Sequence, residues 1–177
     1  IKSLFIRKSM NLQQSKLRTW VEIDSQTVKH NYKIFRSLIG KKIQLMAIVK
    51  SNAYGHGLVE FSKLVDNLGI DWFGVDSIVE AERLCLEGIK KPILVLGPTL
   101  ISKFPEAKNK DIYLTVSNFE TLKSLIKGKN CPKFHIKIDT GMHRQGFYLE
   151  DTPKVIKKLK AEGSKPQAAL AGLYTHF

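Results

Sequence analysis

The amino-acid sequence predicts an α/β protein in which parallel strands alternate with helices. Short apolar runs of strand length begin near residues 43, 72, 93, 112, 134 and 170, and helical segments with one apolar face lie between them. Successive runs are separated by roughly 20–40 residues, which is the spacing of βα units in a parallel sheet or barrel. Hydrophobic residues make up 43% of the chain and charged residues 25%, as in a globular domain.

The first elements precede this regular alternation. Residues 20–24 (WVEID) alternate apolar and acidic side chains, which predicts a half-exposed strand. Ser25 is a suitable N-cap for the helix that follows, and Gly40 is expected to end that helix. The strand 43–49 then leads to Lys50 and to a loop rich in Asn, Tyr, Gly and His.

The remaining elements form βα pairs. The predicted strands cover residues 72–75, 93–96, 112–116, 134–138 and 170–175. The predicted helices cover residues 58–68, 78–87, 102–108, 117–126 and 152–161. Ser117 is expected to cap one of these helices, and Pro153 lies in the first turn of another, where proline is favoured. A closed (β/α)8 barrel needs eight strands and typically about 250 residues, so six strands predict an incomplete barrel.

Lys50 is the first candidate for chemistry, because it stands where the apolar strand 43–49 ends. In α/β barrels the active site is built at this carboxyl-terminal rim. A lysine whose stem lies in an apolar strand end is desolvated, which favours the neutral amine that attacks aldehydes. Pyridoxal phosphate (PLP) is the cofactor that presents such an aldehyde. The residues alone leave open the alternative of a solvated lysine at the strand boundary.

Five segments of the chain resemble those of alanine racemases, a family of PLP enzymes with a barrel domain. They follow the order and spacing of the family, from about Arg18 to the last residue. The segments are residues 19–24 (TWVEID), 47–57 (AIVKSNAYGHG), 91–97 (KPILVLG), 137–146 (KIDTGMHRQG) and 172–177 (GLYTHF). Of these, the segment 47–57 resembles the PLP-lysine signature.

The resemblance implies a PLP-binding (β/α)8 barrel of the TIM type, of which the chain holds about six βα units. Residues 18–177 would form the N-terminal part of that barrel domain, and residues 1–17 an N-terminal extension or linker. The last two barrel strands and the C-terminal β-domain of the family would be absent. Because an open barrel exposes two strand edges and part of its core, we expect that these 177 residues are not by themselves the functional unit.

The resemblance also implies roles for individual residues. Lys50 would be the catalytic base and the residue that is linked to PLP. Tyr54 would bind the PLP phosphate, Leu96 would contact the cofactor ring, and His176 would stack on that ring. Arg144 would approach both the phenolic oxygen of PLP and the carboxylate of the substrate.

Two further positions carry polar side chains of interest. Lys137 lies in mid-strand, where an unpaired cation is costly; in many members of the family the matching lysine is carbamylated and holds the arginine. The alternative is an ion pair between Lys137 and a carboxylate such as Asp139. His56 lies between Gly55 and Gly57, which suit a tight loop, and is expected to support that loop rather than act as a base.

The function that the resemblance implies is PLP-dependent interconversion of L- and D-alanine, which supplies D-alanine for peptidoglycan. In the family a second base, a tyrosine, comes from the partner subunit. The intact protein is therefore expected to be a homodimer, and this chain alone is expected to be inactive. Three alternatives stay open: a serine or broad-specificity amino-acid racemase, a barrel-type PLP decarboxylase, and a non-catalytic PLP-binding protein of the same barrel type.

Charge and composition bear on partners and location. The chain has 29 Lys and Arg against 16 Asp and Glu, a net charge of +13. The basic residues are scattered over helices and turns without an aromatic platform, so we expect no nucleic-acid partner. No apolar run approaches the roughly 20 residues of a membrane helix and no signal peptide is recognisable, so we expect no membrane partner and a cytoplasmic location. Cys85 and Cys131 lack metal-ligand spacing, so neither a metal site nor a disulfide is expected.

Overall fold

The computed structural model describes residues 4–6, 18–128, 131–161 and 169–177. Its central element is an open sheet of six parallel strands whose spatial order, β3-β4-β5-β6-β7-β8, is also their order in the sequence. The strands are β3 (Met46–Ile48), β4 (Trp72–Val75), β5 (Ile93–Val95), β6 (Tyr113–Val116), β7 (Phe134–Lys137) and β8 (Leu170–Tyr174). This arrangement confirms the predicted α/β class and the incomplete barrel.

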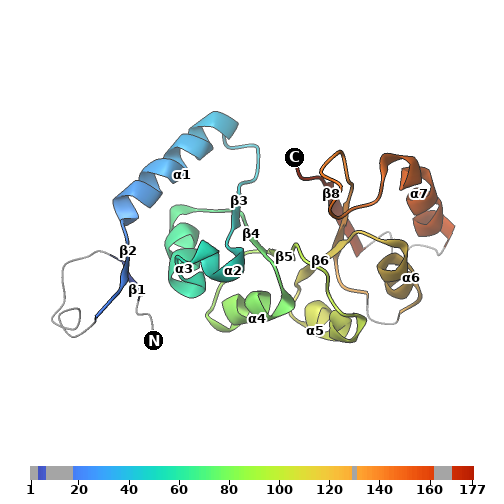
Figure 1. Ribbon diagram of the computed structural model, residues 1–177, viewed down its shortest axis with the longest axis horizontal. Coiled ribbons are helices and arrows are strands. Elements are labelled where there is room, and N and C mark those ends of the chain that lie inside the picture. The colour runs from blue at the N-terminus through green and yellow to red at the C-terminus, as the bar shows by residue number, and fades with distance from the viewer. Residues whose placement is uncertain (1–3, 7–17, 129–130, 162–168) are drawn as a thin grey trace.

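Helices connect successive strands and cover one side of the sheet (Figure 1). They are α3 (Leu58–Leu68), α4 (Ile78–Leu86), α5 (Phe104–Asn109), α6 (Phe119–Lys127) and α7 (Thr152–Ala161), with 3₁₀ turns at η2 (Ile101–Lys103) and η3 (Leu149–Asp151). The bounds of α3 and α7 are those predicted from the sequence. None of the helices in the described ranges has the length and apolar character that a membrane crossing requires.

The hydrophobic core lies between the sheet and these helices. Phe73, Val75 and Phe134 project from β4 and β7 and are fully buried. They belong to one core cluster with helical residues such as Leu84 and Leu122. Because the outer face of each strand is committed to this core, side chains on the opposite face and at the strand ends are available for a site.

The N-terminal part of the chain stands apart from the main sheet (Figure 1). It consists of β1 (Leu4–Ile6), which pairs in parallel with β2 (Val21–Ile23), and α1 (Ser25–Ile39). The rest of the predicted extension 1–17 lies outside the described residues. No residue of α1 is buried, and Arg36 ties this helix to the domain through a 2.6 Å hydrogen bond to the carboxylate of Asp71.

The structure corrects three predicted details, besides shifts of one or two residues in the bounds of other elements such as α5 and β2. Asp24, not Ser25, caps α1, because its carboxylate accepts a 3.0 Å hydrogen bond from an amide in the first turn. Likewise Asn118, not Ser117, caps α6 through a 2.8 Å hydrogen bond. The strand before Lys50 is also shorter than 43–49, since β3 begins at Met46. In both helices the true cap is one residue away from the serine, and its oxygen reaches a free amide at the helix start.

Candidate active site

A cavity of about 650 Å³ opens along the carboxyl ends of the strands. Residues that the sequence analysis assigns to the cofactor or the substrate all line it, together with the mid-strand lysine: Lys50, Tyr54, Leu96, Lys137, Arg144 and His176. The topology explains why residues so far apart in sequence meet, because the carboxyl ends of parallel strands lie at one edge of the sheet.

Lys50 reaches the cavity at the start of residues 50–57, which we call the lysine loop. The preceding residue, Val49, is fully buried, and its amide donates to the carbonyl of Gly74 at 2.8 Å. This bond continues the β3–β4 pairing up to Lys50, so the position of the lysine backbone is set by the sheet. The Lys50 side chain is partly buried.

A left-handed helical turn follows Lys50 directly. Ser51, Asn52, Ala53 and Tyr54 have φ between 51° and 58°. A left-handed backbone costs roughly 1–2 kcal/mol for each residue that carries a Cβ, so this turn is strained. Strain of this kind gathers at functional sites, where the surrounding structure holds it. The turn was not predicted from the sequence, and it places Tyr54 at the cavity.

Polar contacts hold the strained turn in place. The side-chain oxygen of Asn52 accepts a hydrogen bond from the backbone amide of Leu58 at 2.8 Å. The backbone amide of Asn52 donates to the carboxylate of Glu80 at 3.1 Å. The other oxygen of Glu80 accepts the amide of Asp76, after β4, at 2.9 Å. Asn52 and Glu80 therefore anchor the lysine loop to the start of α3 and to the loop after β4. Sequence analysis did not single out either residue.

His56 contacts the lysine loop itself. Its Nδ1 atom lies 2.7 Å from the carbonyl oxygen of Ala53, and its ring centre lies 5.6 Å from that of Phe61. Gly55 and Gly57 flank it with φ of 93° and 89°, values that a residue with a Cβ adopts only at a cost. These contacts are those of a residue that supports the loop.

Arg144 reaches the cavity from residues 139–147, which we call the arginine loop. At its start the carboxylate of Asp139, which is 9% exposed, accepts the amides of Gly141 and His143, both at 3.0 Å. These two hydrogen bonds hold the pKa of Asp139 below its usual value, because they favour the ionised form. The charge of Asp139 thus organises the first turn of the loop that presents Arg144.

The arginine loop then closes back onto β7. The amide of Asp139 donates to the carbonyl of Phe147 at 2.8 Å, and the amide of Phe147 donates to the carbonyl of Lys137 at 2.9 Å. Phe147 is buried and packs edge-on against Phe119, with ring centres 5.0 Å apart. Gly146 permits this closure, because a Cβ at that position would lie 2.5 Å from the amide nitrogen of Asp139.

Lys137 is 5% exposed, and its amine donates a hydrogen bond to Gln145 Oε1 at 3.4 Å. Burial lowers the pKa of this amine, and the positive charges of Arg144 and Lys50 lower it further, against the opposing effect of Asp139. The ion pair with Asp139 that the sequence left open is not found among the described residues, where that carboxylate instead accepts backbone amides.

Tyr174 of β8 forms another wall of the cavity. Sequence analysis did not single out this residue. It lies opposite Lys137 in the strand register, and the Lys137 Nζ atom is 5.7 Å from the centre of its ring. Its hydroxyl is 2.9 Å from that of Thr115, which donates to the carbonyl of Val95 at 2.7 Å. Tyr174 is therefore the donor to Thr115, and burial raises the pKa of its phenol. The signal for Tyr174 is its spacing of two residues from His176, because side chains two residues apart in extended backbone point to the same side.

The chemistry of the lining fits PLP. Lys50 offers an amine for the aldehyde, Arg144 offers positive charge for phosphate and carboxylate anions, and Leu94 and Leu96 offer apolar surface for the ring. The volume of about 650 Å³ lies within the range of small-molecule sites, which is roughly 300–1,000 Å³.

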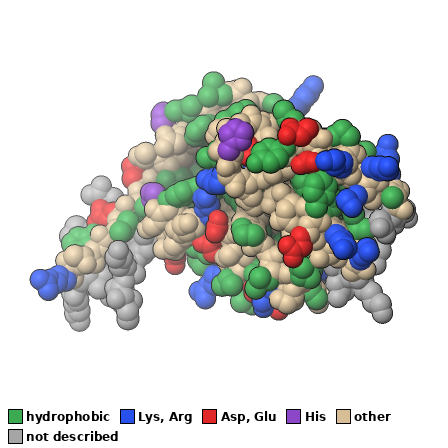
Figure 2. Space-filling model, turned by 45° about the vertical axis from the view of Figure 1, so that its right-hand side comes forward, with side chains coloured by type: hydrophobic (Ala, Val, Ile, Leu, Met, Phe, Trp, Pro, Cys, Tyr) green, Lys and Arg blue, Asp and Glu red, His purple; other side chains and the backbone are tan. Residues whose placement is uncertain are grey.

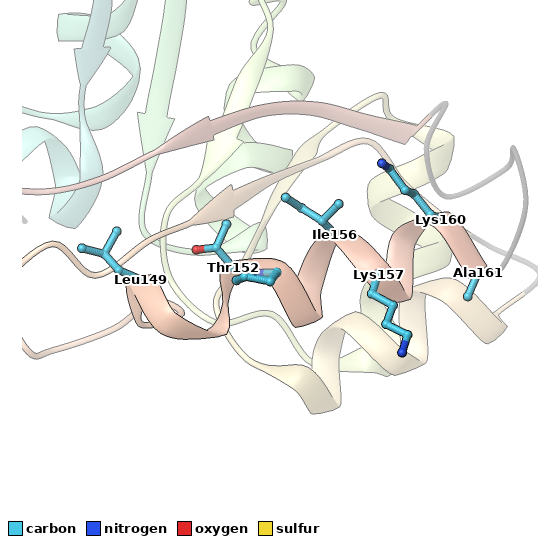
Figure 3. A pocket seen from close by; sticks show the side chains of 7 residues that line it. Leu149, Thr152, Ile156, Lys157, Lys160 and Ala161 are labelled. Carbon is cyan, nitrogen blue, oxygen red and sulfur yellow. The ribbon is translucent and has the colours of Figure 1, made fainter.

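A second hollow, of about 770 Å³, lies outside the sheet along α7 (Figure 3). It is lined by Leu149, Thr152, Pro153, Ile156, Lys157, Lys160 and Ala161. Figure 2 shows Lys and Arg side chains gathered on the right-hand side of the molecule, where α6 and α7 lie. None of the residues that the motifs single out lines this hollow, so the cavity at the strand ends is the candidate active site.

Comparison with known proteins bears on this site. The family model described as "Alanine racemase, N-terminal domain" matches residues 23–177. The chain belongs to the alanine racemase family. This confirms the resemblance drawn from the five sequence segments. The alanine racemase of Fusobacterium nucleatum subsp. nucleatum is 34% identical over 161 residues, which cover 91% of this chain and 44% of that relative.

Solved structures of the alanine racemase family have the same fold. An alanine racemase from Clostridium difficile 630 matches with a TM-score of 0.80 and 31% identity, over 92% of this chain and 43% of that one. A histidine racemase from Leuconostoc mesenteroides subsp. sake matches with a TM-score of 0.75 and 31% identity, over 86% of this chain and 41% of that one. The chain spans less than half of the length of these relatives.

Proposed function

We propose that this chain supplies the lysine-bearing barrel part of a PLP-dependent racemase that interconverts L- and D-alanine. The observation that carries the proposal is the meeting of Lys50 and Arg144 in one cavity at the carboxyl edge of the sheet. An amine that can hold an aldehyde cofactor thus lies beside a group that recognises carboxylates. Formation of D-alanine for peptidoglycan, in the cytoplasm, belongs to the same proposal.

Each lining residue has a task in this reaction. PLP, when bound, supplies an aldehyde that reacts with amines and a ring that withdraws electrons from the substrate Cα. Lys50 would hold the cofactor and then take or return the Cα proton on one face. Arg144 would bind the substrate carboxylate with its planar donors. Tyr54 would donate its hydroxyl to the phosphate, while Leu96 and His176 would contact the ring.

We further propose that Lys137 is carbamylated. Its amine is buried, its pKa is lowered, and the cations Arg144 and Lys50 act on it. A neutral amine attacks CO₂, so that an N–C bond forms and one proton is released. The product is an anion, which would pair with Arg144 and remove the repulsion between the two cations. With ¹³C-labelled bicarbonate, we expect a carbamate carbon signal by NMR that is absent from a Lys137→Ala variant.

A racemase also needs a proton donor on the opposite face of the substrate Cα. We assign this second base to a tyrosine of a partner subunit in a homodimer of the full-length protein. Lys50 alone would exchange the Cα proton with solvent without inverting the centre. In deuterated water, a site with Lys50 as its one base is therefore expected to label L-alanine at Cα and to form little D-alanine.

The central test is covalent trapping of PLP on Lys50 in the full-length protein. We expect a visible absorbance band with added PLP, loss of that band on borohydride reduction, and a pyridoxyl group on the Lys50 peptide by mass spectrometry. Lys50→Ala should lose the band and reduce racemisation by a factor of about 10²–10⁴, the usual contribution of an acid–base group. Lys63→Ala is the matched control, because Lys63 lies on α3 and pairs with Glu87. Trapping on another lysine would refute the proposal.

A different amino-acid substrate is a second candidate, because a histidine racemase is among the structural neighbours. Alanine, serine and histidine compared at equal concentration decide between them. A higher kcat/KM for histidine or serine than for alanine would replace the proposed substrate and leave the roles of Lys50 and Arg144 unchanged.

A further inference from the structure

We propose that Gln145, supported by Ser117, is the positioning residue that holds the terminal amine of Lys137 beside Arg144. The inference rests on the proposed function for the task of Lys137, whereas the contacts that carry it come from the structure alone. Neither Gln145 nor Ser117 has a role in the sequence motifs beyond the predicted helix cap, which Asn118 provides instead.

Three side chains from separate elements form a continuous chain of hydrogen bonds. The amine of Lys137, in β7, donates to Gln145 Oε1 at 3.4 Å. The amide nitrogen of Gln145, in the arginine loop, donates to the Ser117 hydroxyl at 3.2 Å. Ser117 follows β6, so its position is set by the neighbouring strand. Among the described residues no other hydrogen bond to the Lys137 amine is found, although the residue is 5% exposed.

The backbone fixes Gln145 where this contact forms. The next residue, Gly146, approaches the backbone of Asp139. Phe147 follows; it is buried, its amide donates to the carbonyl of Lys137 in β7, and its carbonyl accepts from the amide of Asp139. These contacts hold the end of the arginine loop in place. Binding of the amine by Gln145 therefore does not cost the conformational entropy of ordering a mobile loop. A glutamine on a clamped backbone is a more effective partner than one on a flexible segment.

An amide side chain is suited to a lysine whose charge can change. Its oxygen accepts a hydrogen bond from an amine, and after a 180° rotation of the amide group its nitrogen donates to an anion. The Ser117 hydroxyl adapts, since it can accept from the amide nitrogen or donate to the amide oxygen. The pair Gln145 and Ser117 can therefore satisfy Lys137 both as an amine and as a carbamate without leaving a buried polar group unpaired.

The other groups that face Lys137 cannot do this. Arg144 and Lys50 are cations that oppose its protonation. Asp139 favours protonation, but its carboxylate is held by backbone amides. The ring of Tyr174 faces the amine, and its hydroxyl donates to Thr115, away from the amine. Among these neighbours Gln145 is the neutral group that contacts the amine, so replacing it should change the charge state of Lys137.

The test is the pKa of Lys137 in the full-length protein. It is measured in CO₂-free buffer from the pH dependence of labelling by a small amine-reactive reagent, with peptide mapping to identify the labelled lysine. Gln145→Glu places a carboxylate against the amine and should raise its pKa by about 1–3 units. Labelling at a fixed pH below the pKa should then fall at least about tenfold. Gln145→Leu removes the acceptor and should increase labelling. Ser117→Ala should shift labelling in the same direction as Gln145→Leu, by less.

The control is Gln44→Leu, because Gln44 also accepts a side-chain hydrogen bond, from Trp72 at 2.9 Å, in the strand-entry segment rather than at Lys137. It should leave the labelling of Lys137 unchanged. If Gln145→Glu and Gln145→Leu shift labelling equally or in the same direction, the inference is wrong. PLP trapping on Lys50 is measured in the same variants: trapping without the predicted shifts overturns this inference alone, and the shifts without trapping overturn the proposed function alone.

Discussion

The lysine loop and the arginine loop perform similar tasks by different physical means. Both follow strands of one sheet, and both bring a cation to the same cavity. The lysine loop does so through four consecutive left-handed residues, from Ser51 to Tyr54, that its neighbours must hold in place. The arginine loop does so through Asp139, whose carboxylate accepts backbone amides of the loop, and through Gly146, which fits against the backbone of Asp139.

The difference shows where most of the strain in the site lies, because four left-handed residues with a Cβ stand in the lysine loop and one, His143 with φ 53°, stands in the arginine loop. Left-handed geometry at residues with a Cβ costs about 1–2 kcal/mol each, so the lysine loop lowers the stability of the fold. The arginine loop has charge-assisted hydrogen bonds from Asp139 to two amides, which stabilise it. The strained loop carries Lys50, the residue proposed to react, and the stabilised loop carries Arg144, the residue proposed to bind. Three pairs of substitutions, each a variant and its matched comparison, test this contrast.

The largest effect is expected when the arginine loop loses its glycine. In Gly146→Ala the new Cβ would lie 2.5 Å from the amide nitrogen of Asp139 and 2.8 Å from the carbonyl carbon of Ile138, at φ 139°. Backbone atoms cannot move aside as a side chain can, so we expect a loss of about 3 kcal/mol or more in the free energy of unfolding. Chemical denaturation of the purified variant measures this loss.

Gly55→Ala in the lysine loop is the matched comparison. A Cβ there meets nothing within 4 Å, although φ is 93°. Its cost is therefore the backbone strain alone, about 1–2 kcal/mol. Equal losses for the two alanine variants would show that the arginine loop is not held by the close approach of Gly146 to β7.

The sequence was sufficient to predict the parallel sheet and the positions of most helices. Periodicity placed α3 and α7 at their observed bounds, because their apolar faces pack on one core. It misplaced the caps of α1 and α6 by one residue, because Asp24 and Asn118 compete with adjacent serines for the same amides. Local patterns cannot decide such a competition, since the outcome depends on the backbone angles at the helix start.

The site was predicted in part. Residues of the motifs, such as Lys50 and Arg144, could be expected at one rim because parallel strands end at one edge. The left-handed turn could not, since residues such as Ser51 and Ala53 adopt that geometry only when the surrounding structure holds it. The contact between Gln145 and Ser117 joins residues 28 positions apart, and no local signal predicts it.

The second test concerns the charge of Asp139. Because its pKa is lowered in the folded state, this carboxylate contributes stability above its unfolded pKa of about 3.9, and the contribution is lost as pH falls through the folded pKa. Asp139→Asn keeps an oxygen for the two amides but has no charge. The variant should be less stable than the unmodified protein at pH 7, and the difference should shrink below about pH 4.

Denaturation curves at several pH values measure this difference. Glu150→Gln is the control, because Glu150 is exposed and lies just beyond the arginine loop. A stability difference for Asp139→Asn that stays constant from pH 7 to pH 3 would mean that hydrogen-bond geometry, not charge, organises the loop.

The smallest effect, and the one of opposite sign, is expected in the lysine loop. Ser51 is exposed and has φ 54°, so Ser51→Gly should relieve left-handed strain and stabilise the protein by about 0.5–1 kcal/mol. Ser37→Gly makes the same exchange in the right-handed helix α1, where it should destabilise by about 0.5 kcal/mol. Opposite signs for the two serine variants would show that the strain at Ser51 is real, and the same sign would place the backbone cost of the lysine loop elsewhere. If that strain also positions Lys50, the more stable Ser51→Gly variant should trap PLP more slowly, because the lysine next to the turn is then held less firmly.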